Sequence, residues 1–523
     1  MSKFAVALLL ASTIVTVHAH AAKKTVCTIT VNSPDEKEAF RARLPKGEYE
    51  FVELVEKGRD DWLRSSCERK VQCDVLVISG HFNAGETFYS DKNEIEEHLQ
   101  VDELERASCS QSCPALFANL KEVYLFGCES LNPDAAKYSS RYGESGRERM
   151  RRIFANVPGI YGFSGAAPVG PTAAMLLNRT FDAGGGSAFA TGQNNQRLLN
   201  VFARNHMVRV SGVSGSEAQS SHRAQICEFF DERKGPAQKV AYIHALMRRD
   251  MGEARVAFAR IEKLFASLTE AERQAPAFQH ALAEISADDA TRDRYLGFER
   301  ATRDAGMRAR MIDLAAMLGW LTPEARRGEM VAMIDDLLAS HSMGFAEVDL
   351  VCTANADGAL DAAAASVHVP PAKANGIAQA AVMACLGNPD ARERTIRALA
   401  SPDERDVQIA QSYLRLRPVS DAKELRVLAR DVTRMPGSSA QVRALDALAR
   451  LNISDRQILA DLTRSFAEAR SASVQRAIAE IFIRSDPKAL PRPDLAAALR
   501  DHRLRAPGGG GSDLIDVLLA RLQ

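Results

Sequence analysis

The chain has no excess of charge of either sign, because its 67 lysines and arginines are matched by 67 aspartates and glutamates. A surface that attracts nucleic acid or an anionic membrane needs a clear excess of positive charge, so we expect neither as a partner. After the first 21 residues, the best apolar stretch is residues 377–386, about half of what a membrane-spanning helix needs. The sequence therefore predicts no membrane span in the mature protein.

The first residues carry the pattern of a secretory signal peptide. Lys3 precedes an apolar stretch, residues 4–17, and the small residues Ala19 and Ala21 mark a cleavage point after Ala21. The apolar stretch is too short for an anchoring helix. We therefore expect residues 1–21 to be removed. The low ratio of lysine to arginine and the high alanine content are typical of a Gram-negative bacterium, so we expect a periplasmic or secreted protein.

Residues 25–230 alternate between short apolar runs and helical patterns. Strands are predicted at residues 25–31, 49–55, 75–79, 123–126, 159–163 and 207–210, and helices at 35–43, 60–70, 95–107, 145–155, 172–181 and 194–202. Strands that alternate with helical crossovers predict an α/β fold with a mostly parallel sheet and helices on both faces. We place this domain at residues 22–232.

From about residue 235 the strand signals end, and apolar residues recur at helical spacing. Three similar stretches, residues 407–416, 442–451 and 474–483, begin 35 and 32 residues apart. Helix pairs at this period resemble HEAT-type repeats, whose curved face can hold a protein partner. We predict an α-helical repeat domain over residues 233–505, with a non-repetitive helical bundle as the alternative. Residues 506–523 read as a glycine-rich linker and a terminal helix.

His81 and Cys128 each follow an apolar run that reads as a buried strand, residues 75–79 and 123–126. The stretch between the runs is long enough for the crossover that a parallel pair requires. If the strands are neighbours, both side chains emerge at the carboxyl edge of the sheet, where open α/β sheets bind ligands. An imidazole beside a thiol is what a cysteine nucleophile needs at neutral pH.

A strand, Gly and His, followed by a strand, a small residue and Cys, resembles the caspase-like cysteine peptidases (clan CD). Residues 127–130, Gly-Cys-Glu-Ser, are most similar to the bacterial CHAT branch, and the strand at 159–163 followed by the helix after Pro168 agrees with it. The resemblance covers roughly residues 23–230. It implies an endopeptidase that acts on protein or peptide substrates, with Cys128 as nucleophile, His81 as base and no cofactor.

The resemblance also implies an oxyanion hole made by the backbone N–H groups of Cys128 and of the residue after His81. Most such peptidases have Gly there, whereas this chain has Phe82. Phe82 still supplies an N–H, and an oxyanion hole needs donors, not particular side chains. A Phe, however, restricts the backbone and is expected to crowd the cleft. The alternative is therefore a catalytically inactive caspase-like protein that binds partners through its helical repeats.

The chain has nine cysteines, an odd number. In an oxidising compartment eight can pair and one stays free, and we expect Cys128 to be the free one. The bridges we propose are Cys67–Cys73, Cys109–Cys113, Cys352–Cys385 and, by elimination, Cys27–Cys227. No C-x-x-C pair or nearby His completes a tetrahedral set, so no metal site is expected. Two interpretations apply to the acidic residues near His81 and Cys128: they line a pocket for a basic substrate side chain, or they are solvated loop residues. Charged loop residues are usually solvated, so we assign none of them to specificity: Glu86, Asp91, Glu129 and Asp134.

Overall fold

The computed structural model describes residues 23–54, 63–83, 86–90, 98–110, 113–134, 145–168, 170–217, 219–249, 251–339, 343–356, 358, 360, 376–504 and 514–522. The predicted signal peptide and glycine-rich linker lie outside these residues. The chain forms two compact units, residues 1–285 and 286–523.

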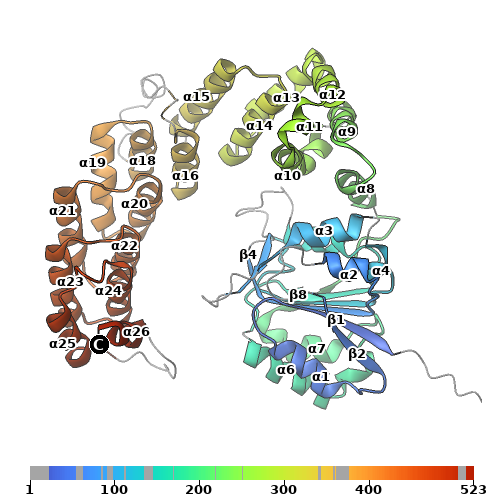
Figure 1. Ribbon diagram of the computed structural model, residues 1–523, viewed down its shortest axis with the longest axis horizontal. Helices are drawn as coiled ribbons and strands as arrows, with labels where there is room; N and C mark the ends of the chain where they lie inside the picture. The colour runs from blue at the N-terminus through green and yellow to red at the C-terminus, as the bar shows by residue number, and fades with distance from the viewer. Residues whose placement is uncertain are drawn as a thin grey trace, which may run out of the picture. The chain divides into compact units, whose positions relative to one another are not determined.

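A six-stranded sheet forms the centre of the first unit (Figure 1). Its order is β2-β1-β3-β7-β8-β9, and every pair is parallel except β8 with β9. The strands are β1 (Lys24–Thr30), β2 (Tyr49–Glu53), β3 (Val75–Ser79), β7 (Glu122–Phe126), β8 (Gly159–Phe163) and β9 (Met207–Val210). The predicted α/β fold class is confirmed.

Helices cover both faces of this sheet because its strands are apolar on both sides. Alternate strand residues enter two separate cores. On one face Leu76 and Leu125 pack with residues of α3 (Val101–Cys109) and α5 (Gly146–Ile153). On the other face Val77 and Phe126 pack with residues of α1 (Asp35–Arg43) and α6 (Gly170–Asp182). The unit's other helices are α2 (Arg64–Glu68), α4 (Pro114–Ala118), α7 (Gln196–Val201), α8 (Gln219–Phe230), α9 (Pro236–Arg249), α10 (Met251–Ser267), α11 (Glu270–Gln274) and α12 (Pro276–Ser286).

A second sheet of three short antiparallel strands was not expected from the sequence. It consists of β4 (His81–Asn83), β5 (Thr87–Tyr89) and β6 (His98–Gln100) in that order. Each strand buries its middle residue, Phe82, Phe88 or Leu99, between two more exposed neighbours. This period of two makes residues 98–100 a strand, so the predicted helix over residues 95–107 is too long and α3 begins at Val101.

Four disulfides and one free thiol, that of Cys128, account for all nine cysteines, as predicted. The Cys352–Cys385 bridge is confirmed. The other three predicted pairings are wrong, because the topology brings together cysteines that are distant in sequence. Cys27 of β1 pairs with Cys73 just before the neighbouring β3, Cys67 of α2 pairs with Cys113 before α4, and Cys109 of α3 pairs with Cys227 of α8.

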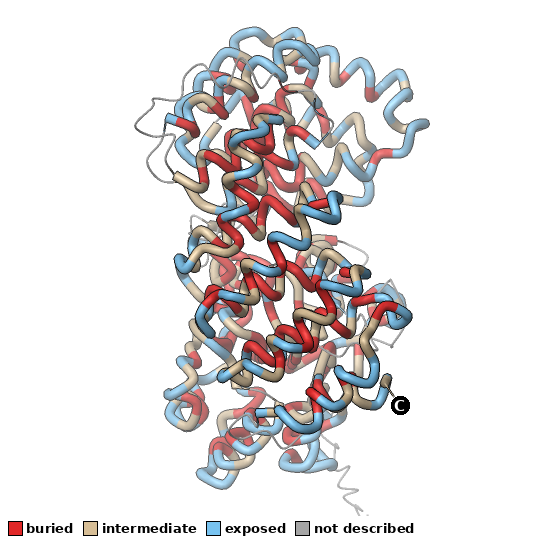
Figure 2. Tube along the Cα trace, turned by 90° about the vertical axis from the view of Figure 1, so that its left-hand side faces the viewer, coloured by how far each residue is buried: buried red, intermediate tan, exposed pale blue. Residues whose placement is uncertain are grey.

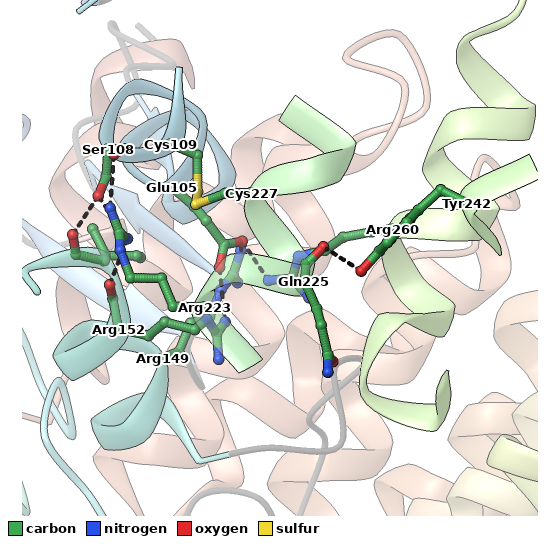
Figure 3. The surroundings of a disulfide bond; sticks show 11 residues. Glu105, Ser108, Cys109, Arg149, Arg152, Arg223, Gln225, Cys227, Tyr242 and Arg260 are labelled. Atoms are coloured by element: carbon green, nitrogen blue, oxygen red, sulfur yellow. Dashed lines mark hydrogen bonds and ion pairs between the residues drawn. A yellow bond between two sulfur atoms is a disulfide. The ribbon is translucent and has the colours of Figure 1, made fainter. Parts of the chain in front are cut away.

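A buried ion cluster lies beside the Cys109–Cys227 bridge (Figure 3). Glu105 of α3 accepts hydrogen bonds from Arg149, Arg152 and Arg260, with 2.7 Å between Arg152 Nη2 and Glu105 Oε1. Burial alone would raise the pKa of Glu105, but the three guanidinium groups hold it well below its usual range. The cluster joins α3, α5 and α10 within the first unit.

The second unit contains only helices among its described residues. Alternate helices stack: α20 packs on α22, α22 on α24, α21 on α23, and α23 on α25. Buried residues gather on the sides of the helices that face one another (Figure 2). The helices are α13 (Asp289–Ala301), α14 (Ala305–Met317), α15 (Pro323–Ala339), α16 (Phe345–Ala354), α18 (Ile377–Cys385), α19 (Pro389–Arg397), α20 (Glu404–Leu416), α21 (Ala422–Thr433), α22 (Ser439–Ala449), α23 (Arg456–Glu468), α24 (Ala472–Arg484), α25 (Arg492–Asp501) and α26 (Leu514–Leu522).

The predicted domain boundary at residues 232/233 falls inside the first compact unit, not at its end. The physical reason is the packing of α10. This helix packs on α8 and α9, and its Arg260 pairs with the buried Glu105 of α3. The change from alternating strands and helices to helices alone therefore precedes the boundary between the units.

Candidate functional site

The parallel pairing of β3 and β7 brings His81 and Cys128 to the same edge of the sheet. Ser79 and Phe126 are register partners at the ends of these strands, and each candidate residue comes two positions later. The Gly80 N–H donates to the Phe126 carbonyl at 3.1 Å, which joins the two strand ends directly. His81 and Cys128 line one cavity of about 340 Å³.

A tight turn after β7 holds Cys128. Glu129 has a φ of 56°, in the left-handed region that residues other than glycine seldom adopt. The Glu129 N–H donates to the Gly165 carbonyl at 2.8 Å, and the Leu131 N–H donates to the Phe163 carbonyl at 2.9 Å. The turn is thus fixed to the end of β8. Cys128 is half-buried and presents the protein's free thiol at the cavity.

The residue before the thiol is glycine because a phenylalanine packs over it. A Cβ atom at Gly127 would lie 2.7 Å from Phe82 Cβ and 3.0 Å from the Phe88 ring. The Phe82 and Phe88 rings pack with 4.4 Å between their centroids. Phe82 is buried in the core and does not line the cavity, so the expected crowding of the cleft by its side chain is wrong. Strand alternation turns its side chain away from the side of β4 that carries His81.

His81 lies on β4, directly opposite Tyr89 of β5. The two rings are tilted by 32° with 5.4 Å between their centroids. Since His81 is half-buried, this ring contact limits the orientations that its imidazole can take on the cavity side. Tyr89 was not among the residues that the sequence singled out.

The segment after β1 supplies residues of the cavity that sequence reasoning missed. Asn32, Ser33, Asp35 and Glu36 line it. Burial raises the pKa of Glu36 to about 7, and the neighbouring Asp35 adds to this, whereas hydrogen bonds with the helix backbone and with Ser79 oppose it. Because β1 is the parallel neighbour of β3, its carboxyl end had to reach the same edge. The sequence did not reveal that β1 and β3 are neighbours, so these residues could not be assigned to the cavity from the sequence alone.

The opposite wall of the cavity comes from the segment before and at the start of α6, with Ala167, Pro168, Gly170 and Pro171. None of the acidic residues considered from the sequence is among the described residues that line the cavity. Glu86, Glu129 and Asp134 do not line the cavity, and Asp91 lies outside the described residues.

Comparisons of the chain with protein-family models, with curated proteins and with solved structures found no match. Within the described ranges, no helix is long and apolar enough to cross a membrane. The same residues contain no group of three or more His, Cys, Asp or Glu side chains placed to hold a metal ion.

Proposed function

We propose that the protein is an exported cysteine endopeptidase of the caspase-like kind, with a Cys128–His81 dyad. One observation carries the proposal: the protein's single unpaired cysteine and His81 occupy equivalent positions after two paired parallel strands and line one cavity. Carboxyl ends of parallel strands are where open α/β sheets carry out their chemistry. The four disulfides suit an exported protein.

The reaction would proceed through an acyl-enzyme. His81 takes the thiol proton, and the Cys128 sulfur attacks the carbonyl carbon of the scissile peptide bond. The tetrahedral intermediate collapses, the C–N bond breaks, and the amine leaves with the proton that His81 returns. His81 then takes a proton from water, whose oxygen attacks the thioester. This step releases the new carboxyl group and restores the thiol, and it requires no cofactor.

The oxyanion would be bound by the backbone N–H groups of Cys128 and Phe82. Burial of the Phe82 ring against Phe88 supports this role, because it fixes the backbone of β4 before substrate binds. Donors that are already oriented cost no reorganisation during the reaction, and one such donor is worth about 3–4 kcal/mol. In this proposal the phenylalanine orients its amide where other members of the group rely on a glycine.

The alternative proposal is a non-catalytic binding protein in which HEAT-like helices hold a partner. It is supported by the stacking of alternate helices in the second unit and by a cavity of about 560 Å³ there, lined among others by Arg392, Tyr413 and Arg417. Repeat proteins use such stacked helices as binding surfaces. This alternative needs no reactive thiol, which makes the two proposals separable.

Alkylation of the thiol separates them directly. The mature protein is treated with iodoacetamide at pH 6–7, and the rate at Cys128 is compared with that of a denatured sample. A dyad predicts fast labelling of Cys128 that is lost in His81→Ala. Labelling no faster than in the denatured sample would favour the binding protein.

Cleavage of a mixed peptide library then tests the reaction itself. We expect new amino termini with the wild-type protein and none with Cys128→Ala. The matched control is His98→Ala, which replaces an exposed histidine of the same small sheet and should leave cleavage intact. Equal cleavage by wild type and Cys128→Ala would contradict the proposal.

A further inference from the structure

We propose that the cavity beside Cys128 receives a cationic side chain of the substrate, that of arginine or lysine, and that Glu36 is the carboxylate that binds it. This inference rests on the proposed function for the position of the scissile bond. The cavity itself, and the charge it prefers, follow from the residues that line it.

Among the described residues of the first unit, three glutamates are almost wholly buried, and two of them accept several hydrogen bonds each. Glu122 accepts the Tyr124 hydroxyl and the backbone N–H groups of residues 190, 191 and 192. Glu105 accepts from three arginines. Glu36 is only 4% exposed, yet its Oε2 atom has no hydrogen-bond partner among the described residues. A buried carboxylate oxygen without a hydrogen-bond partner indicates a site where a donor group of a bound molecule is accommodated.

The charged and titratable groups that line the cavity are Asp35, Glu36, His81 and Cys128, and no lysine or arginine is among them. Asp35 already accepts a hydrogen bond from the Ser33 hydroxyl. Lys37, the basic residue nearest in sequence, pairs with Glu53 at 2.9 Å. The described residues that line the cavity therefore supply no lysine or arginine to pair with the Glu36 carboxylate.

The cavity has the dimensions of a pocket for one side chain. Its volume of about 340 Å³ is near the lower end of the range for small-ligand sites, about 300–1,000 Å³. Gly170 closes one wall tightly against the segment after β1, since a Cβ atom there would lie 2.6 Å from Asp35 Oδ2. Cys128 and His81 form another side, so a side chain bound at Glu36 would extend from a backbone that lies beside the thiol.

Burial makes Glu36 selective for a charged partner. With a pKa raised to about 7, its carboxyl is largely protonated in the empty pocket at slightly acidic pH. A guanidinium or ammonium group would supply the missing counter-charge and displace that proton. Among the elements packed around Glu36, β3 contributes the uncharged Ser79 and the start of α6 contributes Gly170 and Pro171. A neutral side chain of the same length gains none of this charge pairing.

The test uses two peptide substrates that differ only in arginine or citrulline at the residue before the scissile bond. Citrulline keeps the shape of arginine without its charge. We expect the wild type to prefer arginine in kcat/KM, and Glu36→Gln to lower the arginine-to-citrulline ratio roughly ten- to hundredfold, mainly through KM. The matched control is Glu38→Gln, whose exposed carboxylate on the same helix pairs with Arg41; it should keep the ratio. An arginine preference that survives Glu36→Gln, or no preference at all, would overturn the inference.

A second measurement does not depend on catalysis. Agmatine, which carries a guanidinium group, is titrated calorimetrically into Cys128→Ala and into Cys128→Ala/Glu36→Gln, after thermal unfolding has shown that both are folded. Binding that Glu36→Gln abolishes supports the pocket even if the wild type cleaves nothing, and in that case only the proposed function fails. Cleavage by the wild type together with agmatine binding that is equal in both variants, or absent from both, would reject the pocket alone.

Discussion

The folds of the two units are stabilised by different kinds of interaction. The first has a sheet whose neighbours are distant in sequence, three of the four disulfides, and a buried cluster of Glu105 with three arginines. The second consists of stacked helices around one extended apolar core with a single disulfide. The first unit thus adds several specific links between distant parts of the chain to its apolar cores, whereas the described part of the second rests mainly on apolar contacts between helices that are close in sequence.

This difference matters for function because catalytic groups must be held in one geometry. Cys128 and His81 belong to the first unit, where a strained residue, a buried phenylalanine pair and strand register fix their surroundings. In the described part of the second unit, no comparable set of constraints converges on one pair of candidate catalytic residues. Single changes should therefore harm the first unit more than the second.

The largest expected effect is the loss of a long-range disulfide. The Cys109–Cys227 bridge spans 118 residues and the Cys352–Cys385 bridge spans 33. Chain entropy assigns them about 5 and about 4 kcal/mol respectively. Denaturant unfolding should show a larger loss for Cys109→Ala/Cys227→Ala in the transition of the first unit than for Cys352→Ala/Cys385→Ala in that of the second. A larger loss in the helical unit would reverse the comparison.

The second-largest loss of stability is expected when the central charge of the buried cluster is removed. Glu105→Gln leaves three buried arginines without their shared carboxylate, which should lower the free energy of unfolding by about 3–5 kcal/mol at pH 7. Because the arginines hold the folded pKa of Glu105 below that of a glutamate in the unfolded chain, its contribution to stability is fully present above the unfolded pKa and is lost as the pH falls through the folded pKa. The defect should therefore shrink in acid.

The control for this change is Glu103→Gln on the same helix, because Glu103 pairs with Arg106 at a partly exposed position. An exposed pair of this kind is worth at most about 1 kcal/mol. Similar losses for Glu103→Gln and Glu105→Gln would show that the buried cluster is not a special support of the first unit.

Two phenylalanines, one buried and one exposed, test how strongly side-chain burial supports the strand that carries His81. Phe82 is buried over Gly127, whereas Phe345 of α16 is 45% exposed. Phe82→Ala should cost about 3–4 kcal/mol by leaving a cavity, and Phe345→Ala should change stability by less than about 0.5 kcal/mol. Chemical denaturation measures both. If Phe82→Ala were as mild as Phe345→Ala, the Phe82–Phe88 pair would not be what fixes the strand that carries His81.

Local patterns predicted the sheet well, because its strands are short apolar runs that end at glycine or polar residues. All six strands of the large sheet lie within a residue or two of their predicted bounds, as the run 75–79 illustrates. The length of the crossover permitted the strands before His81 and Cys128 to be parallel neighbours, and their pairing fulfils the condition under which both residues reach the same edge of the sheet. Cys352 and Cys385 were paired correctly because helices at a regular period place one cysteine beside the next.

The features that the sequence did not predict depend on how distant segments come together in the fold. Cys27 pairs with Cys73 because β1 inserts between β2 and β3, an order that no local pattern encodes. The small sheet escaped detection because three-residue strands are too short for their alternation to stand out. Glu36 looked like an ordinary acidic residue in the first turn of a helix, where carboxylates are common. Only the burial of that helix start against the cavity distinguishes it.

The smallest predicted effect concerns Glu36, and here a substitution in the first unit should stabilise the protein. The folded pKa of Glu36 is about 7, against 4.5 for a free glutamate. The folded state therefore binds more protons than the unfolded state between these values, and stability falls as the pH rises through this window. Gln is neutral at every pH. Glu36→Gln should thus match the wild type near pH 4 and exceed it by about 2–3 kcal/mol at pH 8.

Thermal and denaturant unfolding at pH 4, 6 and 8 would measure this difference, with Glu38→Gln as the exposed control on the same helix. Saturating agmatine should reduce the advantage of Glu36→Gln at pH 8, because the bound cation relieves the buried charge only where the carboxylate is present. A difference that does not change with pH would mean that Glu36 already has a cationic partner in the free protein. The cavity beside Cys128 would then be complete without a substrate, and its preference for a basic side chain would have no physical basis.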